Sequence, residues 1–196
     1  HNKKIFIDCT SSETLAIQYT DIMSRGFSIV TANKIANTLD MNTYQKIRST
    51  ALENGVGFRY ETNVGAGLPI ISTIKSLLSS GDNIHKIEGV LSGTLSYLFN
   101  NFDGSVPFSK LVKIAHEKGF TEPDPREDLD GMDVARKCLI LAREIGYDME
   151  LNDVQVENLL PEKSDLYQSV DEFINHLGEN DSSFSDRLAK ADRANK

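Results

Sequence analysis

The sequence predicts an α/β protein built around a parallel β-sheet. Three short apolar runs of strand character, at 5–7, 27–30 and 57–61, are separated by two stretches of helical periodicity, at 13–23 and 41–53. Strands that alternate with helices in this way are typical of parallel βαβ units, because two parallel strands need a crossover connection. We therefore expect the first part of the chain to form a parallel sheet with helical connections.

End signals support both of these helices independently of their periodicity. Gly26 follows the first stretch, where a residue in the left-handed conformation commonly ends a helix. The second stretch begins near Asp40 or Asn42, whose side chains suit an N-cap, and Asn54-Gly55 turns the chain into the third strand.

The order of elements changes after the glycine-rich stretch 64–67, where the alternation of strand and helix ends. The sequence predicts a buried helix at 68–78, a longer strand at 84–91, helices at 95–102, 108–118 and 130–146, a short strand at 154–156, and helices at 165–177 and 183–194. Pro107 lies beside the start of one of these helices, where its missing N–H leaves no hydrogen bond unmade.

Composition excludes several classes of protein. Hydrophobic residues make up 39% of the 196 residues and charged residues 26%, which suits a packed core and argues against disorder. The net charge is −8 and no basic stripe is present, so nucleic acid and anionic membranes are not expected partners. No apolar run is long enough to cross a membrane, and the first residues do not form a signal peptide.

The two cysteines, Cys9 and Cys138, lie far apart in the sequence. They fit free thiols in a reducing compartment better than a disulfide framework. We therefore expect a cytoplasmic protein.

Polar residues follow the first two predicted strands. Thr10-Ser11-Ser12 comes after the first strand and Asn33-Lys34 after the second. Ligands of parallel α/β sheets bind beyond the carboxyl ends of the strands. This position favours a binding role for both segments over an exposed lysine and an ordinary N-cap.

The glycine-rich turn 65–70 follows a strand and precedes a helix, which is the place of a dinucleotide fingerprint. Ile70 stands where the third glycine should be, and Pro69 removes an N–H from the first turn, so a phosphate cradle is disfavoured. A turn that permits close backbone approach is the simpler interpretation. Its exposed carbonyls also suit a monovalent cation beside Glu61.

An acidic loop precedes the strongest predicted helix. Five carboxylates lie between Glu122 and Asp130, and Pro123 and Pro125 keep this stretch extended. A calcium loop of the EF-hand type is excluded, because its first and twelfth ligand positions would be basic residues. Helix capping by some of these acids remains an alternative for part of the loop.

Asp133 and Lys137 are four residues apart and share one face of the following helix. The rest of that helix is apolar nearly all round, which predicts burial. Because an unpaired buried charge is unstable, this pair indicates an internal polar pocket.

Taken together, five segments resemble the homoserine dehydrogenase family closely. They are 8–12 (DCTSS), 31–34 (TANK), 62–70 (TNVGAGLPI), 89–97 (GVLSGTLSY) and 119–137 (GFTEPDPREDLDGMDVARK). The last is long and highly specific, and the resemblance covers nearly the whole chain. The stretches 33–38 and 60–70 are most similar to the dehydrogenase part of bifunctional aspartokinase–homoserine dehydrogenases.

The resemblance implies an NAD- or NADP-dependent oxidoreductase that interconverts L-aspartate 4-semialdehyde and L-homoserine, in threonine and methionine biosynthesis. By position it implies these roles: Lys137, Lys34 and Asp128 as catalytic residues; Glu122 and Asp133 as substrate ligands; Thr10, Lys34 and Gly119 as cofactor contacts; and Glu61 with the backbone of Val64, Ala66 and Leu68 as a structural sodium site. It also implies a homodimer or higher homo-oligomer, and a fused aspartokinase domain as a further partner.

The resemblance further implies a fold and a division into domains. The expected domains are the second half of a Rossmann-type parallel sheet at 1–61, an α+β catalytic and dimerisation domain with a mixed sheet at 62–161, and a helical segment at 162–196. The family's glycine-rich cofactor loop has no counterpart in the sequence. We therefore expect an internal fragment with an exposed sheet edge, no dehydrogenase activity of its own and very weak cofactor binding.

Two other functions remain open at this point. One is a non-catalytic folding and dimerisation unit that keeps only the substrate pocket. The other is a metal-dependent lyase that uses the acidic loop.

Overall fold

The computed structural model describes residues 3–162 and 164–193, and the chain forms two compact units. The sheet unit consists of the chain up to Leu91 together with Val134–Gln155. The helical unit consists of Ser92–Asp133 together with the described residues from Val156 onward. Each unit has a hydrophobic core of its own.

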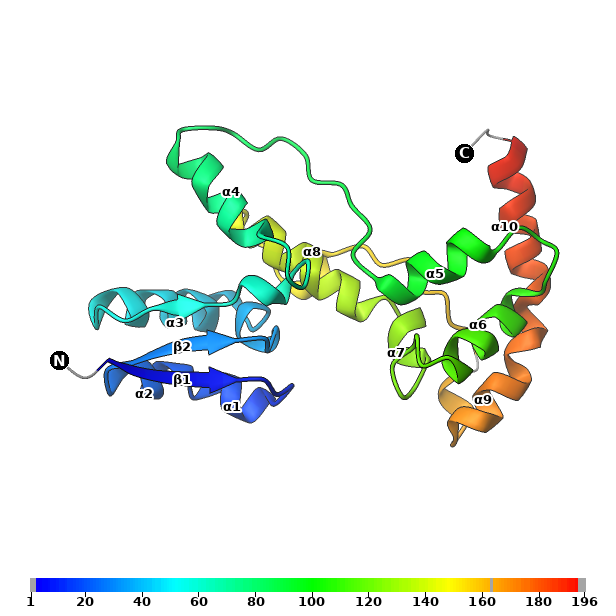
Figure 1. The fold of residues 1–196 in the computed structure, drawn as a ribbon, viewed down its shortest axis with the longest axis horizontal. Helices are drawn as coiled ribbons and strands as arrows, with labels where there is room; N and C mark the ends of the chain where they lie inside the picture. The colour runs from blue at the N-terminus through cyan, green and yellow to red at the C-terminus, as the bar shows by residue number, and fades with distance from the viewer. Residues whose placement is uncertain (1–2, 163, 194–196) are drawn as a thin grey trace. The chain divides into compact units, whose positions relative to one another are not determined.

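A three-stranded parallel sheet organises the sheet unit (Figure 1). The strands β1 (Lys4–Asp8), β2 (Phe27–Thr31) and β3 (Phe58–Arg59) lie in that order, with Lys4 opposite Phe27 and Ile29 opposite Phe58. The connections are α1 (Glu13–Ile17), α2 (Tyr19–Ser24) and α3 (Met41–Glu53). The predicted α/β class and parallel βαβ order are confirmed.

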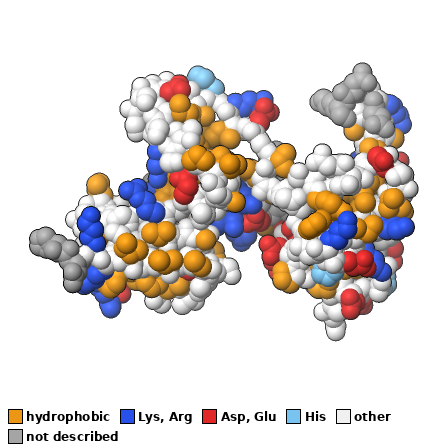
Figure 2. Space-filling model, in the orientation of Figure 1, with side chains coloured by type: hydrophobic (Ala, Val, Ile, Leu, Met, Phe, Trp, Pro, Cys, Tyr) orange, Lys and Arg blue, Asp and Glu red, His pale blue; other side chains and the backbone are white. Residues whose placement is uncertain are grey.

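The sheet is covered on one face. Helices α2 and α3 pack against each other, and the buried side chains of Tyr19, Ile29 and Ile47 join the core between helices and sheet. On the other face Ile5 and Ile7 are 60% and 67% exposed. Figure 2 shows hydrophobic side chains gathered on the part of the surface that carries β1 and β2. Within the described residues β1 pairs with β2 alone, so the expected exposed sheet edge is present.

Helices α4 (Ile70–Ser79) and α8 (Met132–Glu144) complete the core of the sheet unit. α4 buries Ile71 and Ile74, and α8 contributes Ile140 and Leu141. Both helices were predicted, and each begins two residues later than expected. At α8 the Asp130 side chain accepts the N–H of Met132, so the chain turns into the helix after Asp130.

Two predicted strands are wrong. The stretches 84–91 and 154–156 form neither helix nor strand. A strand needs a partner that accepts its backbone hydrogen bonds, and within residues 3–162 and 164–193 neither stretch has one. The mixed sheet expected in 62–161 is therefore absent from the described chain. The predicted helix 13–23 is also divided, because the chain tightens at Gln18, whose N–H bonds to the Leu15 carbonyl.

The helical unit is built from short helices around an aromatic core. Its helices are α5 (Gly93–Asn101), α6 (Phe108–Glu117), α7 (Arg126–Leu129), α9 (Val170–His176) and α10 (Asp181–Arg193). Phe108 stacks on Phe184 with 3.7 Å between ring centroids, and Leu98, Val112 and Phe173 are fully buried around them. The predicted helix 165–177 is shorter than expected, because a 3₁₀ turn, Ser164–Leu166, precedes α9.

The compact units do not follow the divisions expected from the sequence, because α8 brings 134–155 into the core of the sheet unit. The domains 1–61, 62–161 and 162–196 remain a prediction. No helix of the described chain combines the length and the apolar character that crossing a bilayer requires.

Replacing Phe108 by alanine should unfold the helical unit at lower denaturant. The ring is 1% exposed, so its loss leaves a cavity and should cost about 3–5 kcal/mol. Phe99→Ala is the control, because that ring is 49% exposed and its loss should cost about 1 kcal/mol or less. Equal shifts of the denaturation midpoint in the two variants would contradict this core.

Candidate functional site

A buried carboxylate organises the carboxyl edge of the sheet. Asp8, the last residue of β1, is 1% exposed. Its Oδ1 accepts the N–H and the hydroxyl of Thr10, both at 2.7 Å. Its Oδ2 accepts the Tyr19 hydroxyl at 2.5 Å and the Asn33 side-chain amide at 3.1 Å. One carboxylate therefore joins the segment after β1 to the segment after β2.

These hydrogen bonds keep Asp8 ionised. Burial opposes ionisation, but the donors Tyr19, Thr10 and Asn33 outweigh it and lower the pKa of the carboxyl below its ordinary value. Burial, together with the neighbouring Asp8 charge, raises the pKa of Tyr19, so the phenol keeps its proton and donates it. The edge of the sheet is therefore a fixed, negatively charged hydrogen-bond network.

Asn33 extends this network to Lys34. Its side-chain amide also donates to the Ser12 carbonyl at 3.0 Å, and its Oδ1 accepts the N–H of Ile35 at 3.0 Å. Asn33 is 2% exposed, whereas Thr10 is exposed and Lys34 half-buried. Lys34 directly precedes the 3₁₀ turn Ile35–Asn37. The predicted residues Thr10 and Lys34 are thus held by segments that meet at Asp8.

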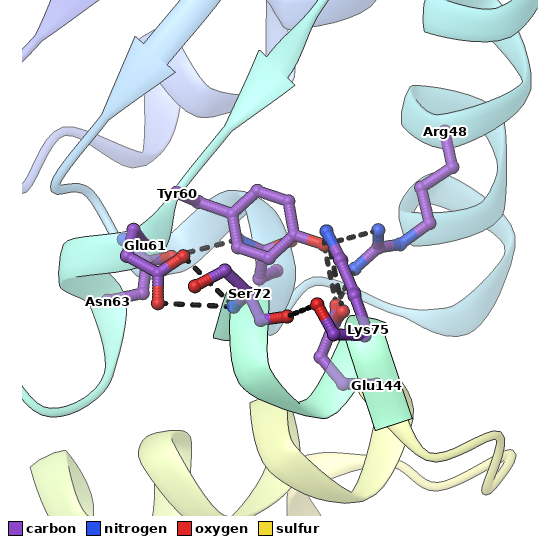
Figure 3. Close-up of polar contacts among 9 residues, drawn as sticks. Arg48, Tyr60, Glu61, Asn63, Ser72, Lys75 and Glu144 are labelled. Atoms are coloured by element: carbon purple, nitrogen blue, oxygen red, sulfur yellow. Dashed lines mark hydrogen bonds and ion pairs between the residues drawn. The ribbon is translucent and has the colours of Figure 1, made fainter. Parts of the chain in front are cut away.

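The glycine-rich turn does not fit a phosphate. Glu61 places both carboxylate oxygens on the N–H of Ser72 in the first turn of α4, at 3.2 and 3.0 Å (Figure 3). A second anion would meet this carboxylate at the same helix end. Gly65 has φ +80°, and a side chain there would lie 2.5 Å from Ile70. The turn therefore permits close packing, as the simpler interpretation predicted.

The same turn offers a donor set for a hard cation. Ala66 adopts φ 51°, a conformation that L-residues other than glycine rarely take. This turn follows Val64, which is buried, and ends at Leu68, whose side chain is exposed. The Glu61 carboxylate and the backbone carbonyls supply only oxygen ligands, which suit a hard cation. Oxygen ligands of this kind are what the predicted sodium site, Glu61 with the backbone of Val64, Ala66 and Leu68, requires, and the site stays a prediction.

In the helical unit the acidic loop is ordered by its own side chains. The N–H of Glu122 donates to Asp128 at 2.8 Å, which joins two predicted site residues. Arg126 grips the Asp124 carboxylate with two nitrogens and donates to the Tyr167 carbonyl at 2.8 Å. Arg126 therefore fixes the conformation of the loop. The Glu122 side chain is exposed to solvent.

Gly119, the predicted cofactor contact, ends α6. It has φ +70°, and its N–H donates to the His116 carbonyl while the N–H of Phe120 reaches Ala115. This pattern closes a helix through a left-handed residue. The Thr94 hydroxyl donates to the Phe120 carbonyl at 2.7 Å, so the start of the acidic loop is tied to α5.

Lys137 lies in α8, four residues after Asp133. Its Nζ donates to the Leu91 carbonyl at 2.7 Å, and the residue is half-buried. The structure therefore places Lys137 and Lys34 in the sheet unit, and Glu122, Asp128 and Asp133 in the helical unit.

A cavity in the sheet unit is a poor candidate for the predicted catalytic site. It measures about 770 Å³ and is lined largely by apolar side chains of 85–91 and α8, among them Val90 and Leu141. None of the predicted catalytic residues lines it. Within residues 3–162 and 164–193 no group of three or more histidine, cysteine or acidic side chains is placed to bind a metal ion, which gives the lyase hypothesis no support.

Sequence reasoning missed a second set of polar residues. Arg48, Tyr60, Lys75 and Glu144 form a hydrogen-bonded cluster in the sheet unit, and its centre, Tyr60 and Glu144, is buried. A faint signal existed, because Glu144 follows the apolar run of α8 and an acid there requires a partner.

Comparison with known proteins follows the same division of the chain. A parallel sheet with polar residues at its carboxyl edge is typical of α/β proteins that bind nucleotides. The homoserine dehydrogenase NAD-binding domain profile matches residues 1–61. The homoserine dehydrogenase profile matches residues 69–195. The chain belongs to the homoserine dehydrogenase family.

Curated relatives agree with this membership. Bifunctional aspartokinase/homoserine dehydrogenases of Buchnera aphidicola and Haemophilus influenzae are 46% and 48% identical over 97% and 95% of this chain. The chain spans 23% of the length of each relative.

Solved structures show the same fold. A Candida auris protein of unknown function matches 97% of this chain and 55% of its own, with 39% identity and a TM-score of 0.91. A hyperthermophilic archaeal homoserine dehydrogenase in complex with NADPH matches 74% of this chain and 44% of its own, with 29% identity and a TM-score of 0.66.

Asp8→Asn should destabilise the sheet unit at neutral pH by about 1–3 kcal/mol, because an amide cannot accept from all four donors. The folded carboxyl has a lowered pKa. Its contribution is therefore present above the ordinary carboxyl pKa and is lost as the pH falls through the folded value. Denaturant unfolding should show a difference in the free energy of unfolding between wild type and variant at pH 7. This difference should be smaller below about pH 4.

Asp21→Asn is the matched control for this measurement. Asp21 pairs with Arg25 at 2.7 Å on the surface of the same unit, and an exposed ion pair contributes only about 0–1 kcal/mol, so the free energy of unfolding of this variant should stay close to that of wild type at both pH values. A gap for Asp8→Asn that stays constant with pH would contradict the ionised network.

Proposed function

We propose that this protein acts as a homoserine dehydrogenase, interconverting L-aspartate 4-semialdehyde and L-homoserine with NAD or NADP. Membership of the family supports this function, and so does one observation above the others. Lys137 lies on α8, the helix that also carries Asp133 and directly follows the acidic loop. Its Nζ donates to the Leu91 carbonyl, which holds the amine in place. Aldehyde reduction needs a proton donor for the oxygen and an acid for the ammonium of the substrate, and α8 carries a residue of each kind four positions apart.

A bound NAD(P)H supplies the hydride that adds to the aldehyde carbon. Lys137 then has the chemical task of this proposal: its ammonium donates a proton to the alkoxide oxygen that forms, and in the reverse direction its amine accepts that proton from the hydroxyl. The bond to Leu91 fixes the direction of the amine. Lys34 and Thr10 serve at the cofactor end, where the Asp8 network positions both segments.

The proposal also assigns roles to the carboxylates of the helical unit. Glu122 and Asp133 bind the α-ammonium of the substrate, because their charge is opposite to it. Asp128 holds the backbone of Glu122 and is the third acid of the site. Gly119 contributes backbone at the cofactor, which its left-handed conformation exposes.

The proposal extends to an ion, partners and a location. Glu61 with the carbonyls of Val64, Ala66 and Leu68 holds a structural sodium ion. The protein forms a homodimer or higher oligomer, as its resemblance to the family implies. It works with an aspartokinase domain, which the names of the bifunctional relatives support. Cys9 and Cys138 are free thiols, which supports the cytoplasm as its compartment.

A non-catalytic folding and dimerisation unit is the second candidate. It is favoured by the glycine-rich turn, since Glu61 already occupies the amide end of α4 and the turn does not accept pyrophosphate. Titration calorimetry with NADPH, NADH and homoserine separates the candidates. Micromolar binding of either nucleotide, with turnover of homoserine, supports the dehydrogenase. Homoserine binding without nucleotide binding supports the second candidate.

In the active dehydrogenase, Lys137→Ala should lower kcat by about 10²- to 10⁴-fold, because proton transfer to the alkoxide is lost. The Kd for NADPH should change little. Lys113→Ala is the control, since that lysine lies on α6 and has no assigned role. Near-normal turnover of Lys137→Ala would remove this residue from the chemical step.

Glu122→Gln and Asp133→Asn should each raise the KM for homoserine by about 10-fold or more, because a charge-assisted bond to the substrate is lost. The KM for the cofactor should stay within about twofold of wild type. Glu127→Gln, in the same acidic loop and without an assigned role, is the control. A selective rise of the cofactor KM would assign the two carboxylates to the wrong ligand.

A further inference from the structure

The C-terminal end of α8 carries a polar cluster around a buried carboxylate, and the proposed mechanism does not use it. We name Arg48, Tyr60, Lys75 and Glu144 the Glu144 cluster (Figure 3). Oε1 of Glu144 pairs with Arg48 Nη2 at 2.5 Å and accepts the Tyr60 hydroxyl at 2.6 Å. Lys75 donates to the Tyr60 hydroxyl at 2.8 Å and lies 3.6 Å from Oε2. Four separate segments, namely α3, the chain after β3, α4 and α8, therefore meet at one carboxylate.

The centre of the cluster is shielded from water, whereas the side chains of Arg48 and Lys75 are 30% and 43% exposed. The Glu144 side chain is 3% exposed and Tyr60 is 2% exposed. Burial raises the pKa of Tyr60, so the phenol remains a donor to Glu144. Arg48 also lies over the rings of Tyr44 and Tyr60, at 4.3 and 5.0 Å from their centroids. Directional bonds in such a dry place fix the position of Glu144 closely.

The neighbouring residue anchors the same helix end to another segment. The guanidinium of Arg143 is fully buried and donates to the carbonyls of Asn37 and Leu39, at 3.1 and 2.8 Å. It also donates to the Met149 carbonyl and pairs with Glu150. Asn37 ends the 3₁₀ turn that Lys34 precedes. Arg143 therefore connects α8 with the segment that carries Lys34.

The geometry of a helix transmits these anchors to Lys137. Glu144 is seven residues after Lys137, which is close to two turns, so the two side chains lie on the same face of α8. The remaining contacts of α8 in the sheet unit are largely apolar, through Ile140 and Leu141. Apolar contacts are non-directional and permit small shifts and rotations of a helix. The polar anchors at 143 and 144 remove that freedom.

We propose that Arg143 and Glu144 are positioning residues that set the place of the Lys137 amine relative to Lys34. The proposal rests on the proposed function for its catalytic consequence, but its structural content stands separately. Loss of either anchor lets α8 shift or rotate, and the Lys137 amine moves away from the line fixed by the Leu91 carbonyl. A displacement of about 1 Å at a reacting group is enough to slow a reaction about 100-fold.

The test compares Glu144→Gln and Arg143→Lys with Asp21→Asn. Glutamine keeps the shape of Glu144 without its charge, and lysine keeps the charge of Arg143 without its several directed donors. Asp21 pairs with Arg25 at 2.7 Å on the surface of the same unit, so its variant makes the same charge change at an exposed pair. Circular dichroism and thermal unfolding first establish which variants are folded at the assay temperature.

Two readouts follow. In steady-state kinetics, Glu144→Gln and Arg143→Lys should lower kcat about 10- to 100-fold and leave the KM for NADPH within about twofold, while Asp21→Asn keeps both. In NMR spectra of the protein with 13C-methylated lysines, the Lys137 signal, assigned by its loss in Lys137→Arg, should move in both anchor variants and stay in place in Asp21→Asn.

The two readouts keep the proposals distinguishable. A wild-type protein that binds both NADPH and homoserine but shows no turnover overturns the proposed function, and the Lys137 signal then decides the positioning proposal by itself. Where the chain binds no nucleotide and therefore lacks turnover, as the sequence leads us to expect, the Lys137 signal again decides the positioning proposal. A folded Glu144→Gln or Arg143→Lys variant with an unmoved Lys137 signal overturns the positioning proposal, whatever the activity. If one variant does not fold, the other gives the answer.

Discussion

Ionised side chains buried in the sheet unit must be surrounded by hydrogen-bond partners, because an unpaired charge in a protein interior is strongly unfavourable. Asp8, Arg143 and Glu144 each meet this requirement with partners from several segments. Removing one partner of such a group typically costs about 3–5 kcal/mol, a large share of a domain's stability. The apolar core drives the chain together, and these groups select one arrangement of helices and strand ends from those that the core permits.

Local signals explain how much of the fold could be predicted. Helix α3 has the limits expected from the sequence, because Asp40 caps it and its apolar positions repeat at helical spacing. The strands β1 and β2 were found for a similar reason, since each is a short apolar run ended by polar residues. The stretch 84–91 shows where this reasoning ends. Its residues have strand character, but strand formation depends on a partner elsewhere in the chain, which composition does not reveal.

The candidate site, too, could be predicted from the sequence only in part. Thr10, Asn33 and Lys34 could be placed at one edge of the sheet, because parallel strands bring their carboxyl ends together. The Glu144 cluster could not be predicted, because Arg48 and Glu144 are 96 residues apart in sequence and no local pattern around either residue indicates the other as its partner. The ring of Tyr19 is buried and its hydroxyl donates to Asp8, a contact that the helical periodicity of 13–23 does not reveal. Hydrogen bonds and ion pairs between side chains that are distant in sequence therefore could not be predicted from local sequence patterns.

The composition of the sheet unit from two separate stretches of chain has a consequence for its biogenesis. Residues 92–133 lie between these stretches and belong to the other unit. During synthesis α4 emerges long before α8, so Ile71 and Ile74 lack Ile140 and Leu141 as neighbours until the second stretch has left the ribosome. The nascent chain consequently passes through a period in which an apolar helix face is open to solvent, and such intermediates are the ones that chaperones bind and that aggregate. Because these contacts join residues distant in sequence, we expect them to slow the folding of the unit.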